Sequence, residues 1–190
     1  MKINALQVCG YYQTNCYLIS DDAQRCAVVD PGGDAADILK ALEVINLKCG
    51  AILLTHGHGD HIGALEEVRQ ATGAKVYIGA GDADRLKTPA DVLLYGGEKV
   101  HAGDLTFDVI AAPGHTPGGL LYVCGDVMVA GDTLFHRSIG RTDLEGGDME
   151  TMRQTLRMIR DLPYTDLMVL PGHGETTTLA YERRFNPFFE

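Results

Sequence analysis

Three histidines and an aspartate lie within six residues of the stretch LTHGHGDHIGA (54–64). His56 and His58 are two residues apart, so in an extended backbone both side chains point the same way and can chelate one metal ion. Asp60 and His61 are adjacent and diverge, so we expect them to serve a second ion close by. The glycines between these residues let the backbone approach an ion closely. The stretch therefore predicts half of a metal site for two ions.

Three further polar residues follow apolar strands on turns that contain glycine. VIAAPG leads to His115, VMVAG to Asp132 and MVLPG to His173. A rigid strand that ends in a loop places a side chain well, and such loops are where sites tend to be built. We therefore expect these three residues to face the cluster at 56–61.

Together these residues make two three-ligand sets and one bridge. The first set is His56, His58 and His115, a type of site that leaves a position open for water. The second set is Asp60, His61 and His173. Asp132 can bridge the two ions, because a carboxylate offers one oxygen to each. Two ions in this arrangement would lower the pKa of a bridging water to about 7 or less and polarise a substrate carbonyl.

Three polar residues outside these sets have simpler interpretations. His101 is expected to be a solvated loop residue. His136, in LFHRSIGRTD, is either a residue at the rim of the site or an exposed loop residue. Asp30, which ends AVVD, either orients a histidine ligand or is an ordinary turn residue before Pro31.

Short apolar runs and turn signals place these residues on a fold of strands and helices. Strands are expected at 3–8, 16–20, 26–30, 50–55, 75–78, 105–112, 120–124, 127–131 and 167–170. One helix is expected after Asp34, which would be its N-cap, with Ile38, Leu42 and Ile45 buried. A second is expected from 62 to about 72. A third is expected after Asp148, also an N-cap, and a fourth over 176–185. The segment 79–97, with a short helix near 83–86, would form a rim or cover a sheet edge. The two strand-rich halves, each closing with a strand and a helix, predict stacked sheets with helices outside.

Composition limits the class of protein. The 190 residues fit one domain spanning 1–190, with 45% hydrophobic and 22% charged residues. A formal net charge of −10 argues against nucleic acid as a partner. No apolar run is long enough to cross a membrane, and the N-terminus does not look like a signal peptide. The five cysteines form no CxxC pair, which indicates reduced thiols. We expect a cytoplasmic protein with no membrane partner.

The motifs THGHGDH, PGHTPGG, AGDT and LPGHGE, in this order, resemble those of the metallo-β-lactamase superfamily. The resemblance implies an α+β fold, the αββα sandwich, with the site at one edge between the two sheets. It also implies the two ligand sets described above, with Asp132 shared.

Within this superfamily, IGRTDLEGGD (139–148) and the ending PGHGETTTLAYERRFNPF are similar to short glyoxalase II-like hydrolases. The resemblance implies hydrolysis of thioesters such as S-lactoylglutathione. Secreted zinc β-lactamases often carry a cysteine where this chain has Asp132, so antibiotic hydrolysis is not expected. The chain ends shortly after His173, so we expect it to lack the C-terminal helical extension with which glyoxalase II binds glutathione. A different thiol is therefore an open alternative.

The expected reaction is attack on the thioester carbonyl by a metal-bridging hydroxide held by Asp60. Two divalent ions are expected, zinc first, although iron or manganese suit the same ligands. Arg141 either holds a substrate carboxylate or forms a surface salt bridge. Other activities considered are an iron-dependent persulfide dioxygenase, a hydrolase of another ester or lactone, a nuclease of the same superfamily, and a metal-dependent binding module without activity. The oligomeric state is left open.

Overall fold

The computed structural model describes residues 1–189, and most of its strands form two six-stranded sheets. The first, sheet A, has strand order β1-β2-β3-β4-β5-β6. Its strands are β1 (Lys2–Val8), β2 (Thr14–Ser20), β3 (Arg25–Val29), β4 (Lys48–Leu53), β5 (Lys75–Gly79) and β6 (Val92–Leu94). β1 to β3 are antiparallel neighbours, whereas β3 to β6 are parallel.

The second, sheet B, has strand order β14-β13-β10-β9-β8-β7. Its strands are β7 (Lys99–Ala102), β8 (Leu105–Ala111), β9 (Leu120–Cys124), β10 (Val127–Gly131), β13 (Met168–Pro171) and β14 (Thr177–Thr178). Only β10 and β13 are parallel neighbours. β9 and β10 form a two-residue hairpin, in which Cys124 pairs with Val127 across Gly125 and Asp126. A small separate hairpin, β11 (Leu134–Phe135) and β12 (Ser138–Ile139), follows β10.

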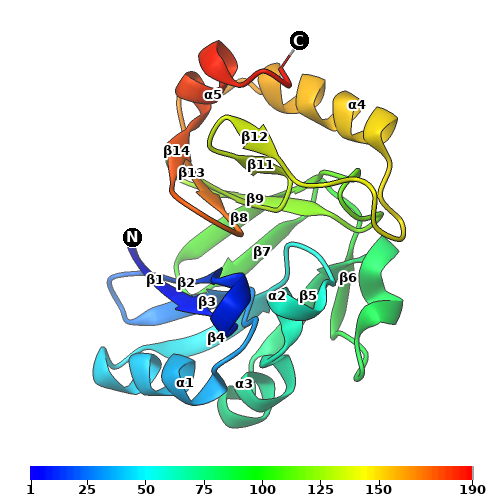
Figure 1. The fold of residues 1–190 in the computed structure, drawn as a ribbon. Helices are drawn as coiled ribbons and strands as arrows, with labels where there is room; N and C mark the ends of the chain where they lie inside the picture. Colours follow the sequence, from blue (N-terminus) through cyan, green and yellow to red (C-terminus); the bar gives the residue numbers. More distant parts are fainter. Residues whose placement is uncertain (190) are drawn as a thin grey trace.

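Three layers of apolar side chains hold the elements together. The middle layer lies between the sheets; β8 shows why, because its alternate residues Leu105, Phe107 and Val109 are buried there. The helices α1 (Ala35–Val44) and α3 (Leu65–Thr72) pack on the outer face of sheet A. The helices α4 (Met149–Arg160) and α5 (Leu179–Phe185) cover the outer face of sheet B (Figure 1). The predicted αββα sandwich is confirmed.

The first helix differs in two respects from the sequence prediction. Asp34 does precede α1, but its backbone is left-handed (φ 52°) and its side chain makes no capping hydrogen bond. Its Oδ2 accepts instead from the backbone N–H of Cys9, at 2.9 Å. Ile45 lies beyond the end of α1 and is 38% exposed, so its predicted burial is wrong. Asp148 does cap α4, accepting from the N–H of Thr151.

The predicted helix from 62 to 72 is interrupted. A short helix α2 (Gly59–Ile62) ends before α3 begins, because the N–H of Ala64 donates to Pro31 O at 2.9 Å instead of continuing a helix. Gly63 permits this close approach: a Cβ there would lie 2.3 Å from Gly32 O. The break sets α2, which carries Asp60 and His61, apart from the helix that follows.

The remaining differences concern short elements. The segment 79–97 contains a 3₁₀ turn η2 (Ala80–Arg85) and the edge strand β6, so its prediction as sheet-edge cover is closest to the structure. The sequence did not predict the short strands β6, β7, β11, β12 and β14, and the last helix begins at Leu179 rather than 176. The five cysteines are free thiols. In residues 1–189 no helix is long and apolar enough to cross a membrane.

Two buried tyrosines join the sheets close to the predicted ligands. The Tyr122 hydroxyl, on β9 of sheet B, donates to Leu54 O at 2.8 Å, two residues before His56. The Tyr17 hydroxyl, on β2 of sheet A, donates to Pro171 O at 2.7 Å, two residues before His173. Each sheet therefore supplies a hydroxyl that binds the chain of the opposite sheet, at the end of the strand that leads to His56 or to His173.

We predict that Tyr122→Phe lowers the free energy of unfolding by about 1–2 kcal/mol, because it leaves Leu54 O buried without this partner. Tyr95→Phe is the control, since Tyr95 is 71% exposed, and it should change stability by less than about 0.5 kcal/mol. Urea unfolding of the metal-free proteins measures both. Equal stabilities for the two variants would contradict a structural role for this hydrogen bond.

Candidate metal centre

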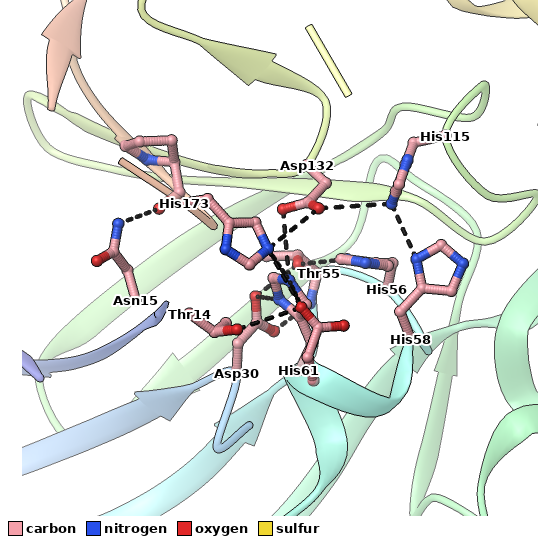
Figure 2. A network of polar contacts seen from close by, with 12 residues as sticks. Thr14, Asn15, Asp30, Thr55, His56, His58, His61, His115, Asp132 and His173 are labelled. Carbon is pink, nitrogen blue, oxygen red and sulfur yellow. Dashed lines mark hydrogen bonds and ion pairs between the residues drawn. The ribbon is translucent and has the colours of Figure 1, made fainter. Parts of the chain in front are cut away.

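The seven predicted ligands gather at one edge of the sandwich, where strands of both sheets end. Figure 2 labels all of them except Asp60. β4 ends at Leu53 and leads to the first cluster, whereas β10 and β13 end at Gly131 and Pro171, next to Asp132 and His173. His115 lies in the loop between β8 and β9. The expectation that these residues face one another is met by the geometry.

The residues fall into the two groups expected from the sequence. His56, His58 and His115 form the first ligand group, and Asp60, His61 and His173 form the second. Within each group, every residue offers one ligand atom within 4.8 Å of the others. Each group combines residues of the first half of the chain with one histidine of the second half.

Asp132 lies between the two groups. Its Oδ2 is 3.6 Å from His115 Nε2 and 3.4 Å from His173 Nε2, and its Oδ1 is 3.4 Å from His61 Nε2. Gly172 makes room for this carboxylate, because a Cβ at that position would lie 2.1 Å from Asp132 Oδ1. Asp132 therefore lies within reach of both groups, where its carboxylate could be shared between two cations.

Hydrogen bonds fix which nitrogen of each ring faces the centre. The Nδ1 atoms of His115 and His173 donate to the carbonyls of Arg141 (2.7 Å) and Tyr12 (3.0 Å), which can only accept. His61 Nδ1 donates to Asp30 Oδ2 at 2.9 Å. In a neutral imidazole with a proton on Nδ1, the Nε2 atom carries a lone pair. These three rings therefore turn an Nε2 ligand atom toward the centre.

His56 is held in the same way, through a threonine. Thr55 Oγ1 donates to Asp30 Oδ2 at 2.6 Å, so it can accept from His56 Nδ1 at 3.1 Å. His58 differs, because its Nδ1 atom lies 2.9 Å from His115 Nε2 and is its inward-facing nitrogen. Asp30 also accepts from the N–H of Thr55. Of the two interpretations of Asp30, the structure supports the one in which it orients histidines.

The donor atoms fit metal ions. Among the described residues, His56 Nε2 and Asp132 Oδ1 are buried without a hydrogen-bond partner, which is costly unless a cation satisfies them. Nitrogen and carboxylate donors of this kind suit zinc, iron or manganese. The clusters can therefore hold metal ions, with His56 and Asp132 as the residues that most need one.

The electrostatics of the centre point the same way. Burial, with a contribution from His61, lowers the pKa of His56 well below its ordinary value, so that ring is neutral. Hydrogen bonds to Asp132 and Asp60 raise the pKa of His173 to about 10. Burial opposes a similar rise in the pKa of His61, but the negative charges of Asp132 and Asp30 outweigh it. Without a cation, protons balance these carboxylates, so metal uptake releases protons.

A groove of about 1090 Å³ opens onto the centre. Its lining includes His58, Asp60, His115, Asp132, Arg141 and His173, together with Cys9, Tyr11, Tyr12, Phe135 and Leu144. These last five residues were not predicted from the sequence. The one sequence feature that could have indicated them is the pair of adjacent tyrosines at 11 and 12, on a turn between two strands. Tyr11 is 96% exposed at the mouth of the groove.

The remaining polar residues are placed as follows. Arg141 lines the groove and also forms a bidentate ion pair with Asp143, at 2.7 and 2.8 Å, so both of its interpretations stay open. His136 pairs with Glu175 at 3.1 Å and packs against the Tyr181 ring. It is absent from the residues that line the groove. His101 is exposed, as expected, but it lies in β7 rather than in a loop, and its ring pairs with Thr106 on β8.

We predict that single histidine variants remove one ion each. His115→Ala should leave only the second group able to bind an ion tightly, and His173→Ala only the first, whereas His101→Ala should keep both. Metal counted per chain after reconstitution with zinc and removal of free metal measures this. Two tightly bound ions in His115→Ala or His173→Ala would contradict the assignment of ligands to the two groups.

Comparison with known proteins agrees with this geometry. The pattern of the metallo-beta-lactamase superfamily matches residues 9–173. Hydroxyacylglutathione hydrolase GloC of Haemophilus influenzae is 34% identical over 99% of this chain and 98% of its own length.

Two solved structures are similar along the whole chain. The BLEG-1 B3 metallo-beta-lactamase is 35% identical, with a TM-score of 0.93 over 99% of both chains. TTHA1623, solved in a di-iron-bound form, is 32% identical, with a TM-score of 0.83 over 99% of this chain and 100% of that one. The ligand motifs, the layered fold and these similarities agree, and the chain belongs to the metallo-β-lactamase superfamily of metal-dependent hydrolases.

Proposed function

We propose that this protein hydrolyses thioesters, with S-lactoylglutathione as the first substrate to test. The observation that carries the proposal is the pair of ligand groups sharing Asp132 at the floor of an open groove. The similarity to GloC, a hydroxyacylglutathione hydrolase, supports this substrate class. We propose zinc as the physiological metal, although the di-iron form of TTHA1623 keeps iron as an alternative.

Two bound divalent ions would supply a water of lowered pKa and polarise the substrate carbonyl. Asp60 is the catalytic residue of the proposal. Its carboxylate lines the groove and is fixed by Thr14 Oγ1, which donates to Asp60 Oδ2 at 3.2 Å. An oriented carboxylate at this place can accept a hydrogen bond from the attacking water and hold it in line with a carbonyl.

A thioester suits a site that lacks an evident general acid. The leaving thiolate belongs to a thiol of pKa about 8.5, so it departs near neutral pH without a proton from the protein. The groove supplies apolar surface from Tyr11, Tyr12, Phe135 and Leu144 for the rest of the substrate. An amide or a phosphodiester has a more basic leaving group, which would need a proton from a general acid.

The BLEG-1 similarity favours a second candidate, hydrolysis of β-lactams. The same groups could position water against a lactam carbonyl, although the expectation from Asp132 is against this reaction. Persulfide oxidation remains the alternative that uses iron and oxygen. The three reactions differ in their products, so one set of assays separates them.

The test uses protein whose metal has been counted in the same sample. We expect loss of the thioester absorbance of S-lactoylglutathione with about two zinc ions per chain, and no turnover after chelation. Inactivity of the two-zinc protein on this and simpler lactoyl thioesters would contradict the proposal. In that case, cleavage of a chromogenic cephalosporin would support the second candidate, and oxygen uptake with glutathione persulfide the third.

We also propose that Arg141 binds a carboxylate on the thiol part of the substrate. Arg141→Met should raise KM for S-lactoylglutathione roughly fivefold and leave kcat within about twofold, because the backbone carbonyl that holds His115 is retained. Asp143→Asn is the matched control: it frees the guanidinium and should leave KM unchanged or lower it. The same KM in Arg141→Met and wild type would mean that Arg141 serves only its ion pair with Asp143.

A further inference from the structure

A buried carboxylate behind the first ligand group is not explained by the proposed reaction. Asp82 lies in η2 and is 0% exposed. It is outside the groups of potential metal ligands found among residues 1–189, and it does not line the groove. A charged side chain at this depth is costly unless its oxygens are satisfied.

Both oxygens of Asp82 accept from backbone N–H groups of the loops that carry the first ligand group. Asp82 Oδ2 accepts from Gly57 N at 2.9 Å, and Asp82 Oδ1 accepts from Gly118 N at 2.9 Å. Gly57 lies between His56 and His58, and Gly118 is the third residue after His115. One carboxylate therefore ties together the two loops that supply all three nitrogens.

The two loops approach η2 more closely than side chains would allow. A Cβ at Gly118 would lie 2.4 Å from Asp82 N, and one at Gly81 would lie 2.7 Å from the carbonyl carbon of Pro117. On the other side, a Cβ at Gly57 would lie 2.8 Å from Arg85 Cδ. These close contacts, with backbone at Gly118 and Gly81 and with the Arg85 side chain at Gly57, leave the carboxylate little freedom to move, so its position sets the separation of the loops.

The charge of Asp82 has one partner nearby, Arg85, whose Nε is 3.8 Å from Asp82 Oδ1. Arg85 also donates to Glu145 O at 2.8 Å, so η2 contacts the loop before α4 as well. Asp30 holds His61 directly, in the second group. Asp30 also reaches His56 of the first group, through Thr55, whereas Asp82 contacts only the first group, through its backbone.

We propose that Asp82 is a positioning residue for the first ligand group: it sets the separation of the His56–His58 loop from the His115 loop, and thereby the affinity for the ion bound there. This inference rests on metal binding by that group. It does not depend on which substrate is hydrolysed, because its readout is metal affinity.

The experiment introduces Asp82→Asn into two backgrounds that isolate the groups. In His173→Ala the first group remains, and in His115→Ala the second. An asparagine keeps the shape but places an NH2 group against one of the two N–H donors. We expect Co²⁺ to bind about 10–100-fold more weakly in the His173→Ala background, with an altered d–d absorption spectrum, and unchanged in the His115→Ala background.

Asp21→Asn is the matched control. Asp21 is 5% exposed and also accepts from two backbone N–H groups of different segments, those of Arg25 and Asp104, at 2.8 and 2.9 Å. None of these residues is among the potential ligands or lines the groove. Asp21→Asn should lower stability by a similar mechanism yet leave Co²⁺ affinity and spectrum unchanged in both backgrounds.

Two results would overturn the proposal. One is unchanged Co²⁺ affinity and spectrum in Asp82→Asn; the other is an equal loss of affinity in both backgrounds, which would mean general destabilisation. If Asp82→Asn unfolds without metal, the dependence of its unfolding midpoint on Co²⁺ concentration reports the same dissociation constant. The two outcomes can then still be told apart.

Discussion

Everything at this site depends on how two sheets are held against each other. Each ligand group takes residues from both halves of the chain, so a shift of one sheet over the other would separate its members. Packed sheets are about 10 Å apart, and apolar packing alone resists sliding weakly. The hydroxyls of Tyr17 and Tyr122 add direction, because each binds a carbonyl two residues before a histidine of the opposite sheet. The sheets are thus fixed at the places where position matters most.

Beneath the ligands lies a set of carboxylates that never reach the groove. Asp30 accepts from Thr55 and from His61, and Asp82 accepts from the loops on either side of the first group. Acceptors with two oxygens suit this task, because one rigid group can hold two segments that are distant in sequence. The result is a polar layer between the apolar core and the centre, in which Asp30 and Asp82 accept from the N–H and O–H groups around them. The buried acceptor atoms His56 Nε2 and Asp132 Oδ1, in contrast, lack a hydrogen-bond partner and are available to a cation.

The sequence was sufficient to predict the layers and which polar residues gather at the centre, but not the residues that support them. His56 to His61 are close in sequence, and each later ligand follows an apolar strand, so local pattern located all of them. Asp82 gave no signal, because its partners are 25 and 36 residues away and it stands in an ordinary polar run. The prediction for Asp34 was wrong for a related reason. A cap on the adjacent helix was predicted, whereas the carboxylate accepts from the N–H of Cys9, which is distant in sequence. Tertiary hydrogen bonds of this kind cannot be read from spacing along the chain.

The assignment of ligands from both sheets to each group also bears on how the protein folds. The first group joins His58 to His115, and the second joins His61 to His173, across 57 and 112 residues. Loops of this length close late, after local structure has formed. A half-folded chain therefore presents incomplete coordination spheres with weak affinity, and tight binding begins only when the two halves dock. A metal ion bound across the two halves would therefore slow unfolding rather than speed collapse.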